Sequence, residues 1–165
     1  AFALQLRTWV EQHSPAEVQA RYSQPLSTMI DGSVASLLRI LHYPPQQGES
    51  KAPRANAHED INLLTILPAA NGPGLLVKHR DGQWITVPNE PGTVIINTGD
   101  MLQEASGGYF PSTTHQVAAG DGVLNESRMS MPLFLHPKAE VKLSDRYTAG
   151  AYLQERLQEL GVIKA

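Results

Sequence analysis

The stretch NAHEDINLLTIL, residues 56–67, joins an imidazole and a carboxylate to an apolar run that is typical of a buried β-strand. His58 and Asp60 are two positions apart, so in an extended strand both side chains point to one face and Glu59 points to the other. An isolated buried carboxylate costs several kcal/mol unless it is paired or bound to a metal ion. The stretch therefore predicts either a His–Asp hydrogen bond at a strand end or part of a metal site.

Short apolar segments, separated by turn residues, surround this stretch on both sides. Pro44 and Pro45 end the first segment, and Asp81-Gly82 predicts a hairpin between two others. Strands that are this short and this regularly spaced predict an antiparallel sandwich or barrel. The expected strands lie within residues 34–43, 61–67, 75–80, 83–88, 92–99, 112–120 and 128–137, the last two joined by a loop that contains Gly-Asp-Gly (120–122).

Apolar residues at helical spacing predict helices at both ends of the chain. After a first helix over residues 2–13, a capping box formed by Ser14 and Glu17 predicts a second helix that runs to about Tyr22. Thr148 is expected to cap a C-terminal helix that Gly161 ends. The chain is therefore expected to have three parts: a helical lead-in (1–33), a β domain (34–147) and a C-terminal helix that packs on the barrel (148–165).

The composition fits one globular domain without a special partner. The 165 residues suffice for a single hydrophobic core, and 13 Lys and Arg against 16 Asp and Glu give no electrostatic reason to bind nucleic acid or an anionic membrane. There is no Cys, no apparent signal peptide and no apolar run of transmembrane length. We expect a cytoplasmic protein with neither nucleic acid nor membrane as partner, its oligomeric state open and a monomer favoured. Because the chain starts at Ala1 inside an expected helix, it is also expected to be a piece of a longer protein.

His115, in the β-rich segment PSTTHQV, supplies a third metal-ligand type. Two imidazoles and one carboxylate on one face of a metal ion leave three coordination positions open, which is the arrangement of non-haem Fe(II) oxygenases. The vacant positions admit a bidentate cosubstrate and then O₂, which a closed site of four ligands could not do.

Arg128 and Ser130 share one face of a further expected strand. A guanidinium that faces into a small barrel needs an anionic partner. Asp121 or Glu126 could provide it, or a bound carboxylate could pair with the arginine and accept the serine hydroxyl. A surface arginine at an edge strand is the alternative.

The order H-x-D, His, R-x-S resembles the isopenicillin N synthase-like family of Fe(II)/2-oxoglutarate-dependent dioxygenases. The resemblance covers roughly residues 34–150 and follows the family order. Its segments are LHYPP (41–45), HEDINLLTIL (58–67), GLLV (74–77), W-x-x-VP (84–88), GTVIINTGDML (92–102), GYFPSTTHQV (108–117) and RMSMPLFLHP (128–137).

This resemblance implies a mainly β fold, a double-stranded β-helix or jelly roll with flanking α-helices. It implies Fe(II) bound by three residues and 2-oxoglutarate as the cosubstrate, with O₂ as the oxidant and a small organic molecule as the substrate. The implied iron ligands are His58, Asp60 and His115, and the implied cosubstrate-binding residues are Arg128, Ser130, Tyr43 and Asn97.

Two departures from the family and two rival functions stay open. Gln116 stands where the family commonly has Arg, and most of the usual N-terminal region is missing, so part of the apolar barrel surface is expected to be uncovered. The preferred function is an oxygenase that releases succinate and CO₂. The alternatives are an isopenicillin N synthase-type oxidase that uses no 2-oxoglutarate, and a non-catalytic cupin-like module that binds a metal or small molecule.

Overall fold

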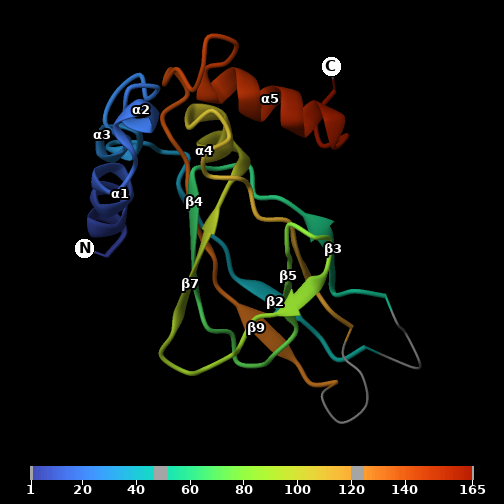
Figure 1. Cartoon of the computed structure of the whole chain (residues 1–165). Coiled ribbons are helices and arrows are strands. Elements are labelled where there is room, and N and C mark those ends of the chain that lie inside the picture. The colour runs from blue at the N-terminus through green and yellow to red at the C-terminus, as the bar shows by residue number, and fades with distance from the viewer. Residues whose placement is uncertain (1, 47–51, 120–124, 165) are drawn as a thin grey trace.

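The structure, a computed structural model, describes residues 2–46, 52–119 and 125–164, and within them short strands outnumber helices (Figure 1). The helices are α1 (Phe2–Gln12), α2 (Ala16–Gln19), α3 (Leu26–Ile30), α4 (Asp100–Ala105) and α5 (Ala149–Glu159). The strands are β1 (Leu37–Leu38), β2 (Leu41–Tyr43), β3 (Ala55–His58), β4 (Leu64–Pro68), β5 (Leu75–Lys78), β6 (Trp84–Thr86), β7 (Val94–Thr98), β8 (His115–Val117), β9 (Arg128–Ser130) and β10 (Leu133–Leu135).

The strands form three antiparallel sheets around a central cavity. One sheet has the order β1-β10-β4-β7, a second has the order β3-β8-β5-β6, and β2 pairs with β9 in a third. Side chains from all three sheets line the same cavity. The arrangement confirms the predicted mainly β jelly roll with flanking helices.

The sheet that contains β4 and β7 separates the hydrophobic core from the cavity. On one face, Leu64 and Ile66 belong to the core cluster with Val10 and Met29 of the helices α1 and α3. On the other face, Thr65 points toward the cavity, as strand alternation requires. Figure 1 shows α1, α2 and α3 on one side of β4 and β7, with α4 and α5 at the top of the barrel.

The helical layer is tied together by a buried arginine. Arg7 of α1 is only 3% exposed, and it donates to the Ser27 carbonyl oxygen (2.8 Å) and to Asp31 Oδ1 (3.0 Å). The layer covers part of the outer sheet face, and some apolar side chains beside it are exposed, among them Leu38 of β1 and Ile96 of β7. An incompletely covered barrel surface was expected from the sequence.

Two predicted strands are each broken into two. The segment 34–43 forms β1 and β2, and the segment 128–137 forms β9 and β10. The strands β1 and β10 belong to one sheet, and β2 and β9 pair in another. The breaks lie opposite each other, because the Arg39 N–H donates to the Pro132 carbonyl oxygen (3.0 Å) between the paired halves. A chain that passes from one sheet to another must bend, and Pro132 has no N–H for a ladder. Single uninterrupted strands were therefore the wrong prediction here.

The opening stretch is also discontinuous, since β3 ends at His58 and β4 begins at Leu64. Asp60 lies in the connection, so the strand alternation predicted from H-x-D does not apply to it. Its orientation comes instead from the loop, whose backbone is fixed by hydrogen bonds to residues 99–101.

The terminal helices are confirmed and the capping box is not. The Thr148 hydroxyl accepts from the Ala151 N–H (3.3 Å), and Gly161 has the positive φ of 68° that ends a helix. The Ser14 hydroxyl donates to the Val10 carbonyl oxygen (2.7 Å) at the end of α1. The four-residue helix α2 has Pro15 rather than Ser14 at its N-cap, and no side chain caps it. The helices α3 and α4 were not predicted. None of the helices in the described ranges is long and apolar enough to cross a membrane.

The hairpin β5–β6 is confirmed with a longer turn than the sequence suggested. The His79 N–H donates to the Gln83 carbonyl oxygen (2.7 Å), which leaves three loop residues, and Gly82 adopts a φ of 90°. A three-residue loop with glycine in the left-handed region is the usual alternative to a two-residue turn. The Gly-Asp-Gly loop lies outside the described residues, and the three-part division of the chain stays a prediction.

Candidate metal centre

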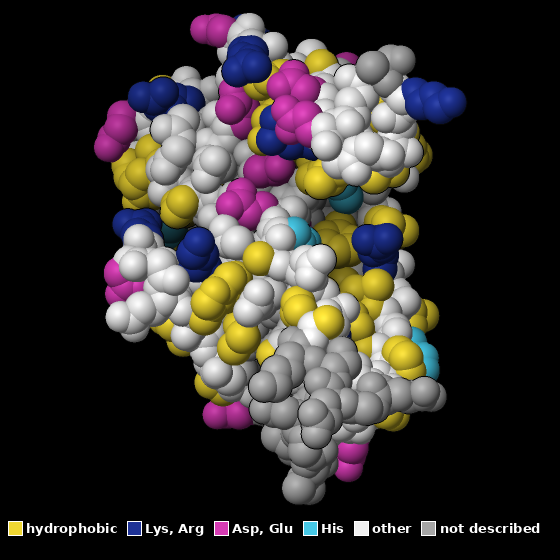
Figure 2. All heavy atoms as spheres, turned by 90° about the vertical axis from the view of Figure 1, so that its right-hand side faces the viewer, with side chains coloured by type: hydrophobic (Ala, Val, Ile, Leu, Met, Phe, Trp, Pro, Cys, Tyr) yellow, Lys and Arg dark blue, Asp and Glu magenta, His cyan; other side chains and the backbone are white. Residues whose placement is uncertain are grey.

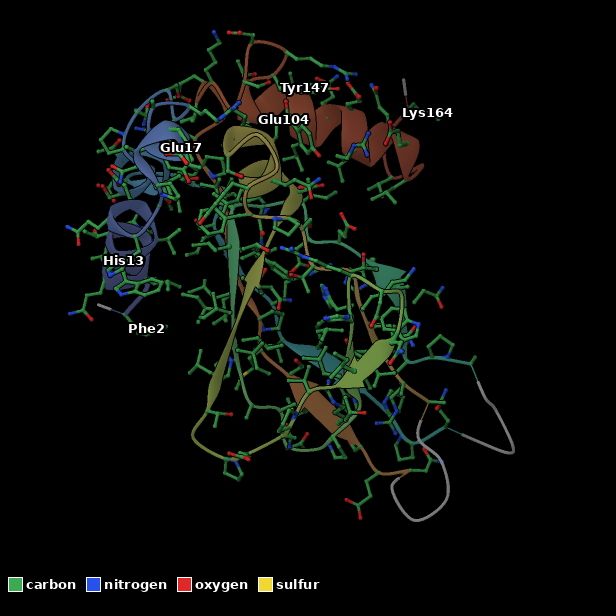
Figure 3. The ribbon with its side chains drawn as sticks, viewed as in Figure 1. Phe2, His13, Glu17, Glu104, Tyr147 and Lys164 are labelled. Carbon is green, nitrogen blue, oxygen red and sulfur yellow. The ribbon has the colours of Figure 1, made fainter. Side chains whose placement is uncertain are left out.

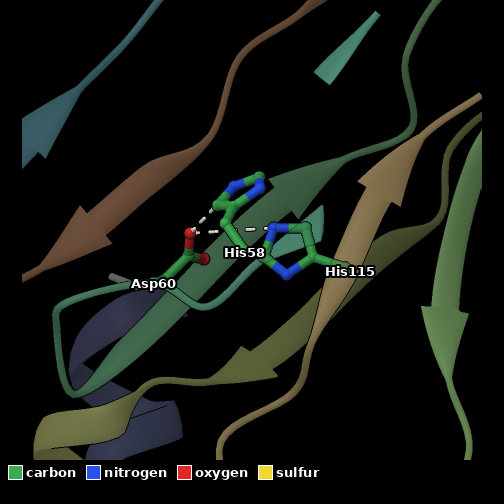
Figure 4. A group of neighbouring side chains, drawn as sticks. All are labelled: His58, Asp60 and His115. Atoms are coloured by element: carbon green, nitrogen blue, oxygen red, sulfur yellow. Dashed lines mark ion pairs between the residues drawn. The ribbon is translucent and has the colours of Figure 1, made fainter. Parts of the chain in front are cut away.

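His58, Asp60 and His115 converge at one end of the sheet that contains β3 and β8. The two histidines are direct partners in the antiparallel pairing, and their ring centroids are 4.3 Å apart. Asp60 Oδ1 lies 3.8 Å from His58 Nε2 and 3.7 Å from His115 Nε2 (Figure 4). All three potential ligand atoms lie within 4.8 Å of one another, and no other such group occurs in the described residues.

Backbone hydrogen bonds decide which nitrogen of each histidine faces the centre. His58 Nδ1 lies 2.7 Å from the Asn56 carbonyl oxygen, and His115 Nδ1 lies 2.9 Å from that of Thr113. A carbonyl oxygen only accepts, so each Nδ1 carries the proton and each neutral ring presents the Nε2 lone pair to the centre. This is the usual arrangement of a metal-binding histidine, in which the second nitrogen fixes the ring and its tautomer. Both rings thus have the orientation that a metal ligand would need.

The carboxylate is the most buried of the three groups. Asp60 is 7% exposed, whereas the His58 side chain is 48% exposed. Glu59 points outward as predicted, where its Oε1 accepts from the Thr114 hydroxyl (2.8 Å). A buried carboxylate facing two neutral imidazoles needs a positive partner, which a divalent cation would supply.

Sequence reasoning did not identify Thr65 or Gly99 as neighbours of Asp60. The Thr65 hydroxyl donates to Asp60 Oδ2 (2.6 Å), and Gly99 packs so closely that a Cβ there would lie 2.8 Å from the Asp60 carbonyl oxygen. A polar residue within the run LLTIL was the available signal for Thr65. No sequence signal marks the close approach of Gly99.

The predicted cosubstrate-binding residues all line the cavity that contains the three converging side chains. Arg128 and Ser130 are buried at 4% and 5% exposed, as strand alternation on β9 predicts. Tyr43 pairs with Arg128 across the β2–β9 ladder, and the guanidinium carbon lies 5.6 Å from the centroid of the tyrosine ring. Asn97 on β7 is also buried. Gln116, the neighbour of His115 on β8, does not line the cavity, because successive side chains of a strand point to opposite faces.

The Arg128 guanidinium is only partly satisfied by the protein. Its Nε donates to the carbonyl oxygens of Gly72 (3.1 Å) and Pro73 (3.0 Å), and its buried Nη1 has no hydrogen-bond partner among the residues that the structure describes. Burial lowers the pKa of Arg128 from its ordinary value. No carboxylate pairs with it in the part of the chain that the structure describes: Glu126 is exposed, and Asp121 lies outside those residues. A cationic donor that points into a cavity without a protein acceptor fits a bound anion.

Other features of the molecule offer weaker sites. An open polar cleft of about 740 Å³ near Arg21, Gly107 and Lys142 brings no metal-ligand group together among the described residues. Figure 3 shows His13 on the helical layer, away from the strands that carry the metal centre. Figure 2, which faces the right-hand side of Figure 1, shows histidine side chains that reach the surface among hydrophobic ones, with acidic side chains gathered above them.

One buried acid, at the start of α4, contacts the candidate metal centre through its backbone. Asp100 is 6% exposed, and burial raises its pKa to about 7, although the neighbouring Tyr152 hydroxyl lowers the pKa. Its backbone N–H donates to the Asp60 carbonyl oxygen (3.0 Å). Asp100 thus touches the centre through its backbone and faces the α5 layer with its side chain.

Known proteins with similar sequences are dioxygenases. Gibberellin 3-beta-dioxygenase 1 of Arabidopsis thaliana is 35% identical over 107 residues, which is 65% of this chain and 29% of the relative. A 2-oxoglutarate-dependent dioxygenase of Gibberella zeae is 36% identical over 110 residues, which is 67% of this chain and 33% of the relative. The chain thus spans about a third of the length of these curated relatives.

Two solved structures extend the similarity to the fold. A candidate oxygenase from Shewanella oneidensis is 57% identical with a TM-score of 0.89, over 98% of this chain and 60% of that one. A full-length Neurospora crassa protein, solved in complex with alpha-KG, is 26% identical with a TM-score of 0.69, over 79% of this chain and 46% of that one. The family model described as the 2OG-Fe(II) oxygenase superfamily matches residues 34–137, which include all seven predicted site residues. On this match, which covers more than half of its length, the chain belongs to the 2OG-Fe(II) oxygenase superfamily.

Proposed function

We propose that the chain carries the catalytic centre of an Fe(II)- and 2-oxoglutarate-dependent oxygenase that oxidises a small organic substrate and releases succinate and CO₂. His58, Asp60 and His115 would hold the iron. Arg128 and Ser130 would hold the distal carboxylate of 2-oxoglutarate, with Tyr43 and Asn97 beside it in the cavity. A location in the cytoplasm and a monomeric state remain predictions.

The observation that carries the proposal is that one cavity holds both a cluster of potential metal ligands and a buried arginine. At one place, two Nε2 lone pairs and a carboxylate oxygen face each other. At the other, Arg128 Nη1 is a buried donor that has no acceptor in the described ranges of the chain. A divalent cation satisfies the first group and a carboxylate satisfies the second, so a metal-chelating dicarboxylate fits both.

The donor set suits Fe(II) and keeps coordination positions available. Neutral imidazole and carboxylate are ligands that Fe(II) accepts, and three protein ligands leave open positions for the cosubstrate and O₂. Bound iron supplies the oxidation chemistry, while the protein supplies position, charge and a water-poor cavity. The cavity measures about 50 Å³ in this structure.

The test is a titration of the anaerobic Fe(II)-loaded protein with 2-oxoglutarate, followed by the weak visible charge-transfer band of the chelate. Wild type is expected to develop the band at sub-millimolar cosubstrate. Arg128→Ala should bind 2-oxoglutarate about 30- to 5000-fold more weakly, because truncating a buried charge-assisted pair costs about 2–5 kcal/mol. Its iron content should stay near that of wild type, since Arg128 is not a ligand.

Arg80→Ala is the matched control, because Arg80 is an exposed arginine in the β5–β6 loop. It should titrate like wild type. A wild-type sample that holds iron but gives no band would contradict the use of 2-oxoglutarate. It would favour either the non-catalytic module or the oxidase, in which Arg128 and Ser130 would hold a carboxylate of the substrate.

A further inference from the structure

Asp60 is anchored at both its backbone and its side chain, although it lies in a connection between strands. Its carbonyl oxygen accepts from the Asp100 N–H (3.0 Å), which fixes the backbone. Its Oδ2 accepts from the Thr65 hydroxyl (2.6 Å), which fixes the rotation of the carboxylate. Only Oδ1 remains directed at the two histidines.

The direction of the Thr65 hydroxyl is itself determined by a second hydrogen bond. Asn62 Nδ2 donates to Thr65 Oγ1 (2.8 Å), and an amide nitrogen cannot accept in return. The single hydroxyl proton of Thr65 is therefore available for Asp60, and the two bonds form a chain from Asn62 through Thr65 to Asp60. Thr65 is 2% exposed and Asn62 is fully buried, so water does not compete for these bonds.

The strand that carries Thr65 is paired on both of its edges. The strand β4 lies between β10 and β7 and pairs with β7 over five residues. A β-branched side chain on such a strand has few rotamers. The hydroxyl is consequently a fixed point against which the link from β3 to β4 is oriented.

We propose that Thr65 is a positioning residue for the metal centre. Its hydroxyl donates a hydrogen bond to Oδ2 of Asp60, so that Oδ1 alone would face the metal. The inference rests on the proposed function, because it assumes that Asp60 is a metal ligand. A carboxylate held in this way uses one coordination position, so the positions needed by cosubstrate and O₂ stay open. Hydrogen bonds to the ligands of a metal commonly change its affinity by about 10- to 100-fold.

The experiment compares Co(II) binding by the wild-type chain and three variants at position 65, measured by visible absorption under anaerobic conditions. Thr65→Val preserves the shape and removes the hydroxyl, and Thr65→Ala removes both the hydroxyl and the methyl group. Thr65→Ser retains the hydroxyl. The Val and Ala variants should bind Co(II) about 10- to 100-fold more weakly, with an altered absorption spectrum, and the Ser variant should stay within about threefold of wild type.

Thermal unfolding of the metal-free proteins shows which variants fold. Valine places a methyl group where the hydroxyl was, and alanine leaves that space empty. Because the two replacements disturb the packing in different ways, at least one folded variant without the hydroxyl is expected. A folded Val or Ala variant with wild-type affinity and spectrum would overturn the inference and leave the metal site intact. Equal loss in the Ser and Val variants would also overturn it, since packing rather than the hydroxyl would then be responsible. A wild-type chain that binds no Co(II) would refute the proposed metal site, and the role of Thr65 with it.

Discussion

At the scale of single residues, the candidate site is organised by hydrogen bonds that leave one potential ligand atom of each side chain facing the centre. The carbonyl oxygens of Asn56 and Thr113 fix the two histidine rings, and Thr65 fixes the carboxylate. All three hydrogen-bond partners come from the protein, so the three side chains would be oriented before a metal ion binds. Preorganisation of this kind reduces the entropy lost on binding.

The buried acid Asp100 gives a prediction for the pH dependence of stability. Its carboxyl pKa is raised from 3.8 to about 7 in the folded chain. The folded state therefore keeps this proton where the unfolded state has lost it. The stabilisation that the protonated Asp100 carboxyl contributes to the folded state is complete below a pH of about 4, and it is lost as the pH rises through about 7. Between pH 5 and 8, wild type should lose about 2–3 kcal/mol of unfolding free energy that Asp100→Asn does not lose.

Urea unfolding of the metal-free wild type and of Asp100→Asn at both pH values measures this difference. Other titrating groups are common to both proteins and cancel in the comparison. Parallel pH profiles for the two proteins would show that Asp100 titrates near its ordinary pKa in the folded chain.

The chemistry-bearing residues could be predicted because their types and order are informative by themselves. His58, Asp60, His115 and Arg128 are costly to bury, so a pattern that places them among apolar residues indicates a site. Thr65 was not predicted, because a threonine in a strand is ordinary until its partner is known. Its role depends on a contact between two segments that fold back on each other.

At the scale of elements, the junction of β7 and α4 supports the loop that carries Asp60. The N–H groups of Gly99, Asp100 and Met101 donate to the carbonyl oxygens of Leu63, Asp60 and Asn62. Successive hydrogen bonds of this kind join the two connections as firmly as a short strand pair. The closeness is possible because residue 99 has no side chain.

Gly99→Ala should therefore be destabilising. A Cβ at this position would clash with both the carbonyl oxygen and Oδ1 of Asn62, so the loop must shift. We expect a loss of about 2–3 kcal/mol in unfolding free energy, at the upper end of overpacking substitutions, together with weaker metal binding. Denaturant unfolding of the metal-free protein measures the first effect.

Gly72→Ala is the matched control, because a Cβ at Gly72 meets nothing within 4 Å. This variant should differ from wild type by less than about 0.5 kcal/mol. A Gly99→Ala protein as stable as Gly72→Ala would mean that the junction does not need this close approach.

Element types were easier to predict than element boundaries. Alternating apolar residues and proline positions identified the strand-forming segments, but not that two of them bend at Arg39 and Pro132 to enter a second sheet. The bend is a requirement of the closed barrel rather than of the local sequence. Ser14 shows the same limit, since its hydroxyl could serve either of two helices and serves the earlier one.

At the scale of the whole molecule, the two faces of one barrel sheet have different roles. The outer face of the β4–β7 sheet packs against the helices and forms the core, while the inner face lines the cavity. The jelly roll could be predicted from the resemblance and the strand spacing. The helices could not all be predicted, because α3 and α4 are short and owe their stability to tertiary packing.

The fold brings His58, Asp60 and His115 together, and every proposal above depends on their binding iron. The decisive measurement is the iron content of anaerobically reconstituted protein, obtained by elemental analysis of wild type, Asp60→Ala and Glu59→Ala. Glu59 is the matched control, because it is the neighbouring carboxylate and its side chain is exposed. Wild type and Glu59→Ala should each hold about one iron per chain, and Asp60→Ala should hold little, because it lacks the only anionic ligand. Equal iron in Asp60→Ala and wild type would show that the three residues are not the iron site.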